Sequence, residues 1–235
     1  MKVLIVFDHP YGLASSENVL HKRSFTAAVA AAAIRGFSQA GHEVDVIDLH
    51  ADGFNPVMTA ADLAAWRKKT VAEGTSRNYQ QRLLAADHVV FAFPIWWESM
   101  PAMTKGFLDK FMTKGVVYHE TKPGRPFENG LKNLRGVTLM TVMATPGFLY
   151  RWLFGNPITK IIFRGTFRKI GVKNLQWMNF CNPAGKTAAQ RKMILEKTEA
   201  RFAAFCPTDN GASQGLTSHS SLAGGTLAQS GGRNK

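Results

Sequence analysis

The amino-acid sequence predicts an α/β fold, in which a doubly wound, five-stranded parallel sheet carries helices on both faces. Short runs rich in apolar and β-branched residues recur along the chain, as is typical of strands buried on both faces. Segments with helical spacing of their apolar residues lie between these runs. Strands and helices therefore alternate, as they do in a parallel sheet.

The first strand is expected at residues 2–7, because KVLIVF is apolar apart from its Lys and ends at Asp8. An Ala-rich helix follows at 24–41, where Ser24 is a suitable N-cap and Gly41 a suitable stop. The further strands are expected at 42–49, 88–94, 136–144 and 174–180. The further helices are expected at 60–72, 76–86, 103–112 and 187–205.

Composition predicts one large domain followed by a tail. Of 235 residues 45% are hydrophobic, which is enough for a full core over residues 1–206. Residues 207–235 hold no aromatic residue, Ile or Val, so a disordered C-terminal tail is expected. The first residues resemble a strand rather than a signal peptide, and no apolar run is long enough to span a bilayer. The two cysteines lack metal-type spacing, so we expect no metal site and a cytoplasmic location.

The formal net charge of +13 indicates acidic partners, which include nucleic acid, an anionic membrane surface and phosphate-bearing small molecules. Basic and apolar residues interleave in KIIFRGTFRKIGVK, at 160–173. This pattern favours a helix with a solvated basic face, and contact with a membrane or a partner is the alternative. No nucleic-acid-binding signature accompanies it, so no nucleic-acid partner is expected.

A ligand site is expected at the carboxyl ends of the strands, where open parallel sheets bind their ligands. Trp96 and Trp97 directly follow the third strand, and the helix that starts near Ser24 offers free N–H groups to the same edge. The loop after the fourth strand, at 143–150, is the third loop expected at this edge. A flat aromatic ligand that carries phosphate would suit these three loops. Core packing of the two tryptophans is the alternative, and the absence of G-x-G-x-x-G argues against nicotinamide binding of the Rossmann type.

The stretch FAFPIWWESMPAMTKGFLDK, at 91–110, resembles the strand–loop–helix of the NAD(P)H:quinone oxidoreductases, flavodoxin-like flavoenzymes that include DT-diaphorase. Three other segments of the chain also resemble this family, at 24–32, 48–63 and 79–94. The resemblance implies FAD, with FMN possible, bound at this edge, reduced by NAD(P)H and oxidised by a quinone or a similar small aromatic acceptor. It also implies a homodimer, to which the apolar segment 147–154 could contribute.

The resemblance also implies which residues form the site. The phosphates and the ribityl chain would contact His9, Ser24, Phe25, Thr26 and Ala28. The flavin ring would contact Pro94, Ile95, Trp96, Trp97, Glu98, Thr145, Pro146, Gly147 and Tyr150. Among them, Trp97 and Tyr150 are expected to take part in catalysis. Trp97 would form a wall of the substrate site, while Trp96 would point toward the core.

The chain departs from the family pattern at several positions. Ala144-Thr145-Pro146-Gly147 stands in place of Thr-Thr-Gly-Gly, and Pro146 removes one N–H donor. Glu98 stands where an aromatic residue is common in DT-diaphorase, and its downstream histidine has no obvious counterpart. Two other classes of protein function stay open at this point. One is an ancillary subunit of a potassium-efflux antiporter, and the other is a binding protein that has lost its flavin.

Overall fold

The computed structural model describes residues 1–17, 19–71, 74–122, 125 and 127–206. Its main sheet has five parallel strands in the order β2-β1-β3-β6-β7, so the predicted doubly wound α/β fold is confirmed. The strands are β1 (Lys2–Phe7), β2 (Glu43–Asp48), β3 (His88–Pro94), β6 (Gly136–Met143) and β7 (Asn174–Cys181). The predicted tail, 207–235, lies outside the described residues.

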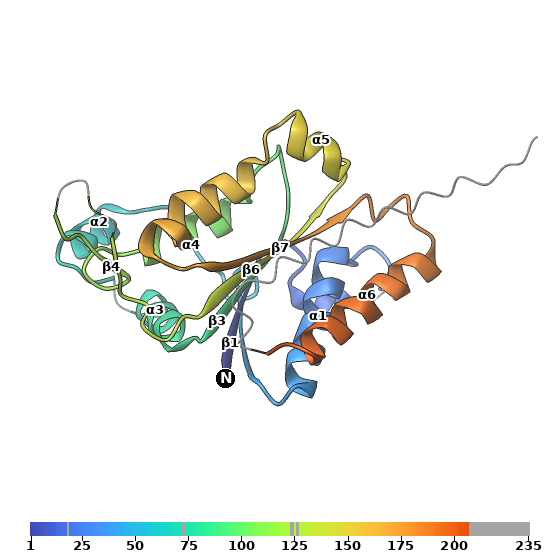
Figure 1. Cartoon of the computed structure of the whole chain (residues 1–235), viewed down its shortest axis with the longest axis horizontal. Coiled ribbons are helices and arrows are strands. Elements are labelled where there is room, and N and C mark those ends of the chain that lie inside the picture. Colours follow the sequence, from blue (N-terminus) through green and yellow to red (C-terminus); the bar gives the residue numbers. More distant parts are fainter. Residues whose placement is uncertain (18, 72–73, 123–124, 126, 207–235) are drawn as a thin grey trace, which may run out of the picture.

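Helices cover both faces of the sheet (Figure 1). The helices α1 (Phe25–Gln39) and α6 (Ala188–Ala203) pack on one face. The other face is covered by α3 (Thr75–Ala85), α4 (Ala102–Phe111) and the π-helix η2 (Thr159–Phe167). The alternation of side chains along a strand explains this division. In β1, for example, Val3 and Ile5 belong to the first apolar cluster and Leu4 and Val6 to the second.

The helices α1 and α6 approach each other very closely at Gly36. A Cβ atom placed on Gly36 would lie 2.3 Å from the carbonyl oxygen of Glu199 and 2.8 Å from Cβ of Phe202. No side chain fits there, because the nearest obstacle is the backbone of α6. Phe37 packs against Phe202 in the same contact, with ring centroids 4.5 Å apart. This glycine therefore fixes the distance between the two helices.

Several short elements were not predicted from the sequence. They are the 3₁₀ turns η1 (Leu13–Ser16) and η3 (Arg168–Ile170), the helix α5 (Gly147–Trp152) and the hairpin of β4 (Tyr118–His119) and β5 (Glu128–Asn129). The helix α2 (Ala60–Arg67) ends earlier than expected, because Lys69 adopts a left-handed conformation with φ 60°. In η2, Ile162 and Phe163 are buried while Arg164 is exposed, which confirms a helix with a solvated basic face. Among the described residues, no helix has the length and hydropathy needed to cross a membrane.

Stability is expected to fall below neutral pH because of His88, which is 1% exposed and hydrogen-bonded to Thr138 Oγ1. Burial, with a smaller effect from His42, lowers the pKa of His88 from 6.5 to about 4. The unfolded chain therefore binds a proton between these values that the folded chain does not, and protons favour unfolding there. The free energy of unfolding should fall by roughly 2 kcal/mol from neutral pH to pH ~5. Urea titrations should show a smaller fall for His88→Gln, and an equal fall would contradict this assignment.

Candidate functional site

The exits of β1, β3 and β6 lie side by side at the carboxyl edge of the sheet. Backbone hydrogen bonds continue across this edge past the strand ends. The N–H of Asp8 donates to Ala92 O at 3.0 Å, and the N–H of Ile95 donates to Val142 O at 2.8 Å. Pro94 and Ile95, two predicted site residues, are buried where β3 leaves the sheet. The three loops that the sequence singled out are thus brought together.

The N-terminus of α1 faces the same edge. Ser24 caps the helix, and its Oγ accepts a hydrogen bond from the N–H of Ala27 at 3.2 Å. The side chains of Ser24 and Thr26 are buried, while Phe25 and Ala28 are half-buried. In the first turn, the N–H groups of Phe25 and Thr26 have no acceptor within the helix. These residues therefore offer main-chain donors rather than side chains to an anion.

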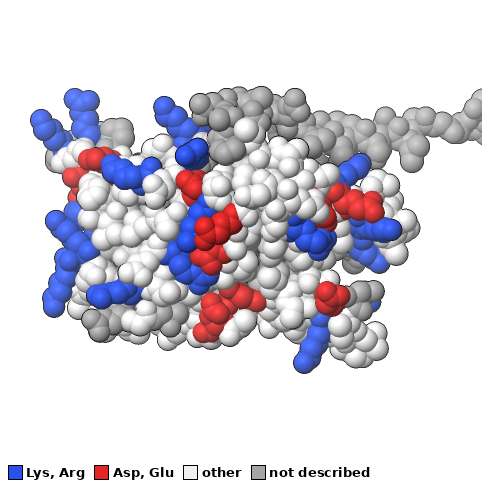
Figure 2. Space-filling view, turned by 90° about the horizontal axis from the view of Figure 1, so that it is seen from below, with Lys and Arg blue, Asp and Glu red and all other residues white. Residues whose placement is uncertain are grey.

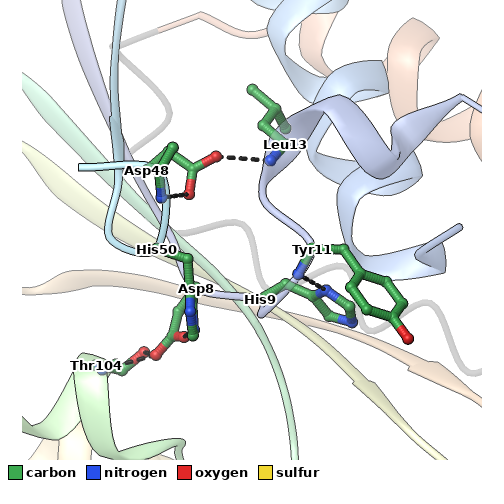
Figure 3. A network of polar contacts seen from close by, with 8 residues as sticks. Asp8, His9, Tyr11, Leu13, Asp48, His50 and Thr104 are labelled. Carbon is green, nitrogen blue, oxygen red and sulfur yellow. Dashed lines mark hydrogen bonds and ion pairs between the residues drawn. The ribbon is translucent and has the colours of Figure 1, made fainter. Parts of the chain in front are cut away.

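Asp8 is fully buried and ties the first loop to α4 (Figure 3). Its Oδ2 accepts from both the N–H and the Oγ1 of Thr104, each at 2.7 Å, and its Oδ1 lies 3.1 Å from His50 Nε2. Thr104 stands in the first turn of α4, whose own N-cap, Pro101, makes no side-chain cap bond. Asp8 therefore caps α4 from a distant part of the chain.

Asp48, at the end of β2, orders the loop after Asp8. One of its carboxylate oxygens accepts from the N–H of Leu13 at 2.6 Å, and the other accepts from the N–H of Ala51 at 3.2 Å. Gly12 passes so close that a Cβ atom there would lie 3.2 Å from Asp48 Oδ2. Gly12 also has φ 66°, which favours glycine. The first loop is consequently held on both sides, by Asp8 and by Asp48.

His9 presents a hydrogen-bond donor at this edge. Its Nδ1 accepts from the N–H of Tyr11 at 3.2 Å, so the neutral ring carries its proton on Nε2. Burial, reinforced by the nearby His50, lowers the pKa of His9, while Asp8 opposes this effect. Figure 3 shows His9 pointing away from the Asp8–Thr104 contact. A neutral N–H donor of this kind suits a phosphate oxygen or a ribityl hydroxyl.

Trp97 is fully exposed, at the tip of a tight turn that follows β3. The N–H and C=O groups of Trp96 and Ser99 pair with each other at 3.0 Å in both directions. Between them, Trp97 and Glu98 have φ angles of 48° and 59°. This geometry is that of a type I′ turn, in which Asn-Gly is favoured and other residues cost free energy. The turn holds a large aromatic surface in water, in a strained conformation.

Trp96 is 44% exposed, so the expectation that it points toward the core is wrong. The turn lifts both tryptophans off the sheet, because it begins at Trp96, immediately after the last buried residue of the strand exit, Ile95. The tryptophan pair is therefore surface at the sheet edge rather than core packing.

Glu98 connects the turn to the loop after β6. Its Oε1 accepts from Thr145 Oγ1 at 3.0 Å. Its Oε2 is buried and has no hydrogen-bond partner among the described residues. A buried oxygen without a donor costs about 1–3 kcal/mol. Glu98 thus keeps one unused acceptor between two of the three loops.

Tyr150 is buried, and its hydroxyl does not reach the open edge. The hydroxyl donates to Glu98 O at 2.9 Å and accepts from the N–H of Ile158 at 3.2 Å. Burial raises the pKa of Tyr150 to about 12, and Glu98 adds to this effect. The structure differs here from the expectation of a catalytic side chain that faces a ligand. Tyr150 instead braces the Trp96–Ser99 turn against α5 and the chain before η2.

The loop after β6 leads directly into α5. Thr145 and Gly147 are half-buried and Pro146 is exposed. A Cβ atom on Gly147 would lie 3.2 Å from Cys181 Sγ, at the end of β7. Burial raises the pKa of the Cys181 thiol, although the N–H of Gly147 opposes this. The predicted residues of this loop therefore line the same edge, and its glycine allows β7 to approach.

Comparison with known proteins places the chain among flavodoxin-like proteins. A family model described as having a flavodoxin-like fold matches residues 1–205. Smu.1420 from Streptococcus mutans, a solved structure, is 26% identical and has a TM-score of 0.72, with 87% of this chain and all of that chain covered.

Two curated relatives are named as oxidoreductases. A protein of Haemophilus influenzae, named as an uncharacterized NAD(P)H oxidoreductase, is 25% identical over 214 residues, which cover 87% of this chain and 98% of that protein. NAD(P)H dehydrogenase (quinone) 1 of Rattus norvegicus is 30% identical over 135 residues. This second match covers 50% of the chain and 49% of the rat protein.

Proposed function

The chain belongs to the family with the flavodoxin-like fold, and on this premise we propose that it is a flavin-dependent NAD(P)H:quinone oxidoreductase. The observation that carries the proposal is the exposed Trp97, held in a strained turn beside two loops that suit the rest of a flavin. The names of the chain's relatives support an oxidoreductase that uses NAD(P)H.

The residues at the carboxyl edge fit a flavin. The free N–H groups at the start of α1, together with His9 Nε2–H, suit the phosphate end. Trp97 offers an aromatic surface to the ring, and Glu98 Oε2 is a buried acceptor that a ring N–H of the ligand would satisfy. The main chain of Thr145 and Gly147 would border the other side of the ring. FAD is the expected form, because several segments of the chain resemble DT-diaphorase, and FMN is the alternative.

A bound flavin would supply the two-electron chemistry between nicotinamide and quinone. The residues of the chain itself hold the elements around the flavin ring in position. Asp8 and Asp48 fix the first loop, and Tyr150 fixes the turn, so the elements that hold the ring would not have to reorganise. Trp97 would form one wall of a site that nicotinamide and quinone occupy in turn.

Flavin binding is the first expected result. The purified protein should show the visible absorption of a bound flavin, or acquire it when it is incubated with FAD. Extraction followed by chromatography would separate FAD from FMN. If the protein stays colourless with both flavins, the proposal fails, and the binding protein that has lost its flavin becomes the better description.

Two finer points belong to the same proposal. A homodimer is expected, and light scattering at micromolar concentration would measure it; a monomer would count against it. The relatives reported above are named as oxidoreductases. Those names give no support to an ancillary subunit of an ion transporter, so we do not propose that role.

A further inference from the structure

The carboxyl group of Glu98 has few partners within the chain. Among the described residues, Glu98 Oε2 and Asn156 Oδ1 are the only buried side-chain oxygens without a hydrogen-bond partner. The other oxygen of Glu98, Oε1, accepts from Thr145 Oγ1 at 3.0 Å. None of the ion pairs found in the described part of the chain includes Glu98. One hydroxyl group is therefore all that these residues offer to compensate its charge.

Glu98 is held at the place where the flavin ring is proposed to lie. Its carbonyl oxygen accepts from the Tyr150 hydroxyl at 2.9 Å, and Thr145 ties its side chain to the loop after β6. Because Oε2 is buried, water and dissolved ions screen its charge poorly. Burial raises the pKa of Tyr150 to about 12, and the charge of Glu98 adds to this rise. The charge of Glu98 thus acts on a buried neighbour in this site.

Other acidic side chains lie beside cations. Figure 2 shows acidic and basic side chains interspersed on the face opposite to α5. Arg35 pairs with Glu199 at 2.7 Å, and Arg82 pairs with Asp45 at 2.6 Å. A paired or solvated acid has little effect on its distant neighbours, because the cation and the water offset its field. Glu98 differs from these acids in both respects.

We propose that Glu98 lowers the midpoint potential of the bound flavin, so that the reduced form is less favourable than it is in water. This inference rests on the proposed function, which places the flavin ring between the Trp96–Ser99 turn and the loop after β6. FAD and FMN carry the same ring, so the inference holds for either form. The charge near the ring is one of the properties by which a protein adjusts the chemistry of its flavin.

The physical reason is the charge that reduction adds to the ring. A hydride from the nicotinamide brings two electrons and one proton to N5, and the ring bears one negative charge until a proton from water binds at N1. A carboxylate nearby opposes this charge, because like charges repel more strongly where water is excluded. The residues expected to contact the ring, at 94–98, 145–147 and 150, include no Lys or Arg that could offset it. The reduced flavin would give up its electrons more readily, so quinones of lower potential would become acceptors.

Glu98→Gln tests the inference, because glutamine removes the charge and keeps an oxygen that can accept from Thr145. The equilibrium constant for reduction of the bound flavin should rise about tenfold, which is about 30 mV for a two-electron couple. Reduced flavin should gain the same factor in affinity relative to oxidised flavin. Titration of the flavin-loaded protein with dithionite against a redox dye measures the potential without any turnover. In the unchanged protein the potential should lie below that of free flavin, a result that requires no variant.

The matched control is Glu196→Gln on α6, which removes the same charge from an exposed position. Its equilibrium constant for reduction should stay within about twofold of the unchanged protein. Three results would overturn the inference: a potential of the unchanged protein at or above that of free flavin, an unchanged potential in Glu98→Gln, or an equal rise in Glu196→Gln. Each of them would leave the proposed function standing. If the unchanged protein binds no flavin, the proposed function itself fails and the inference fails with it.

Discussion

Replacing Asp8 with alanine is expected to lower the free energy of unfolding by about 3 kcal/mol, because two buried groups lose their partner at once. Asp8 accepts two hydrogen bonds from the fully buried Thr104 and faces His50. The first turn of α4 would lose its cap as well. For a domain of this size the loss corresponds to a fall in melting temperature of roughly 6–12 °C. Thermal unfolding followed by circular dichroism would measure it.

Asp8→Asn is the matched control. Its side-chain oxygen can still accept from Thr104, and its NH₂ group can donate to a neutral His50. Only the charge is lost, so the asparagine variant should lose about 1 kcal/mol. Equal losses in the two variants would show that the negative charge, rather than the capping geometry, stabilises α4.

Replacing Trp97 with glycine should separate stability from activity. Trp97 is fully exposed and has φ 48°, a conformation that costs an ordinary residue about 1 kcal/mol and glycine nothing. The variant should therefore be more stable by about 1 kcal/mol. If Trp97 forms a wall of the proposed site, quinone turnover should fall about tenfold or more, since the stacking contact and its burial are both lost.

Trp97→Ala tests the activity without relieving the strain of the left-handed backbone conformation at this position. It should lower quinone turnover as much as the glycine variant, with little change in stability. Trp96→Ala, at a 44% exposed position, should have a small effect on stability. Stopped-flow measurement of both half-reactions would compare the variants. Unchanged flavin affinity and unchanged rates in both Trp97 variants would remove this residue from the site.

The strands and long helices were predictable because their apolar residues repeat with a clear period. Strand β3, HVVFAFP, is buried along its whole length, as its composition predicted. The elements that the sequence did not reveal are short: α5 has six residues, and only Tyr150 among them is buried. Periodicity cannot identify a helix of six residues in which one side chain is buried.

Details of the candidate site were less predictable than its location. The parallel direction of the predicted strands placed three loops at one edge, and the structure brings them together. The Trp96–Ser99 turn could not be predicted, because its central residues, Trp97 and Glu98, lack the Asn-Gly signal of a type I′ turn. The cap on α4 was also missed, although one signal existed. Pro101 cannot serve as a side-chain cap, so the free N–H groups of α4 required an acceptor from elsewhere.

The close contact of α1 with α6 has a consequence for how the protein is made. Arg35 of α1 donates to Glu199 of α6, 164 residues later in the chain. Ribosomes add about 5–20 residues each second, so α1 emerges roughly 8–33 s before its partner. During that interval Gly36 and the ring of Phe37 lack the cover that α6 gives them. The nascent chain thus offers an apolar helix face to chaperones until α6 is synthesised.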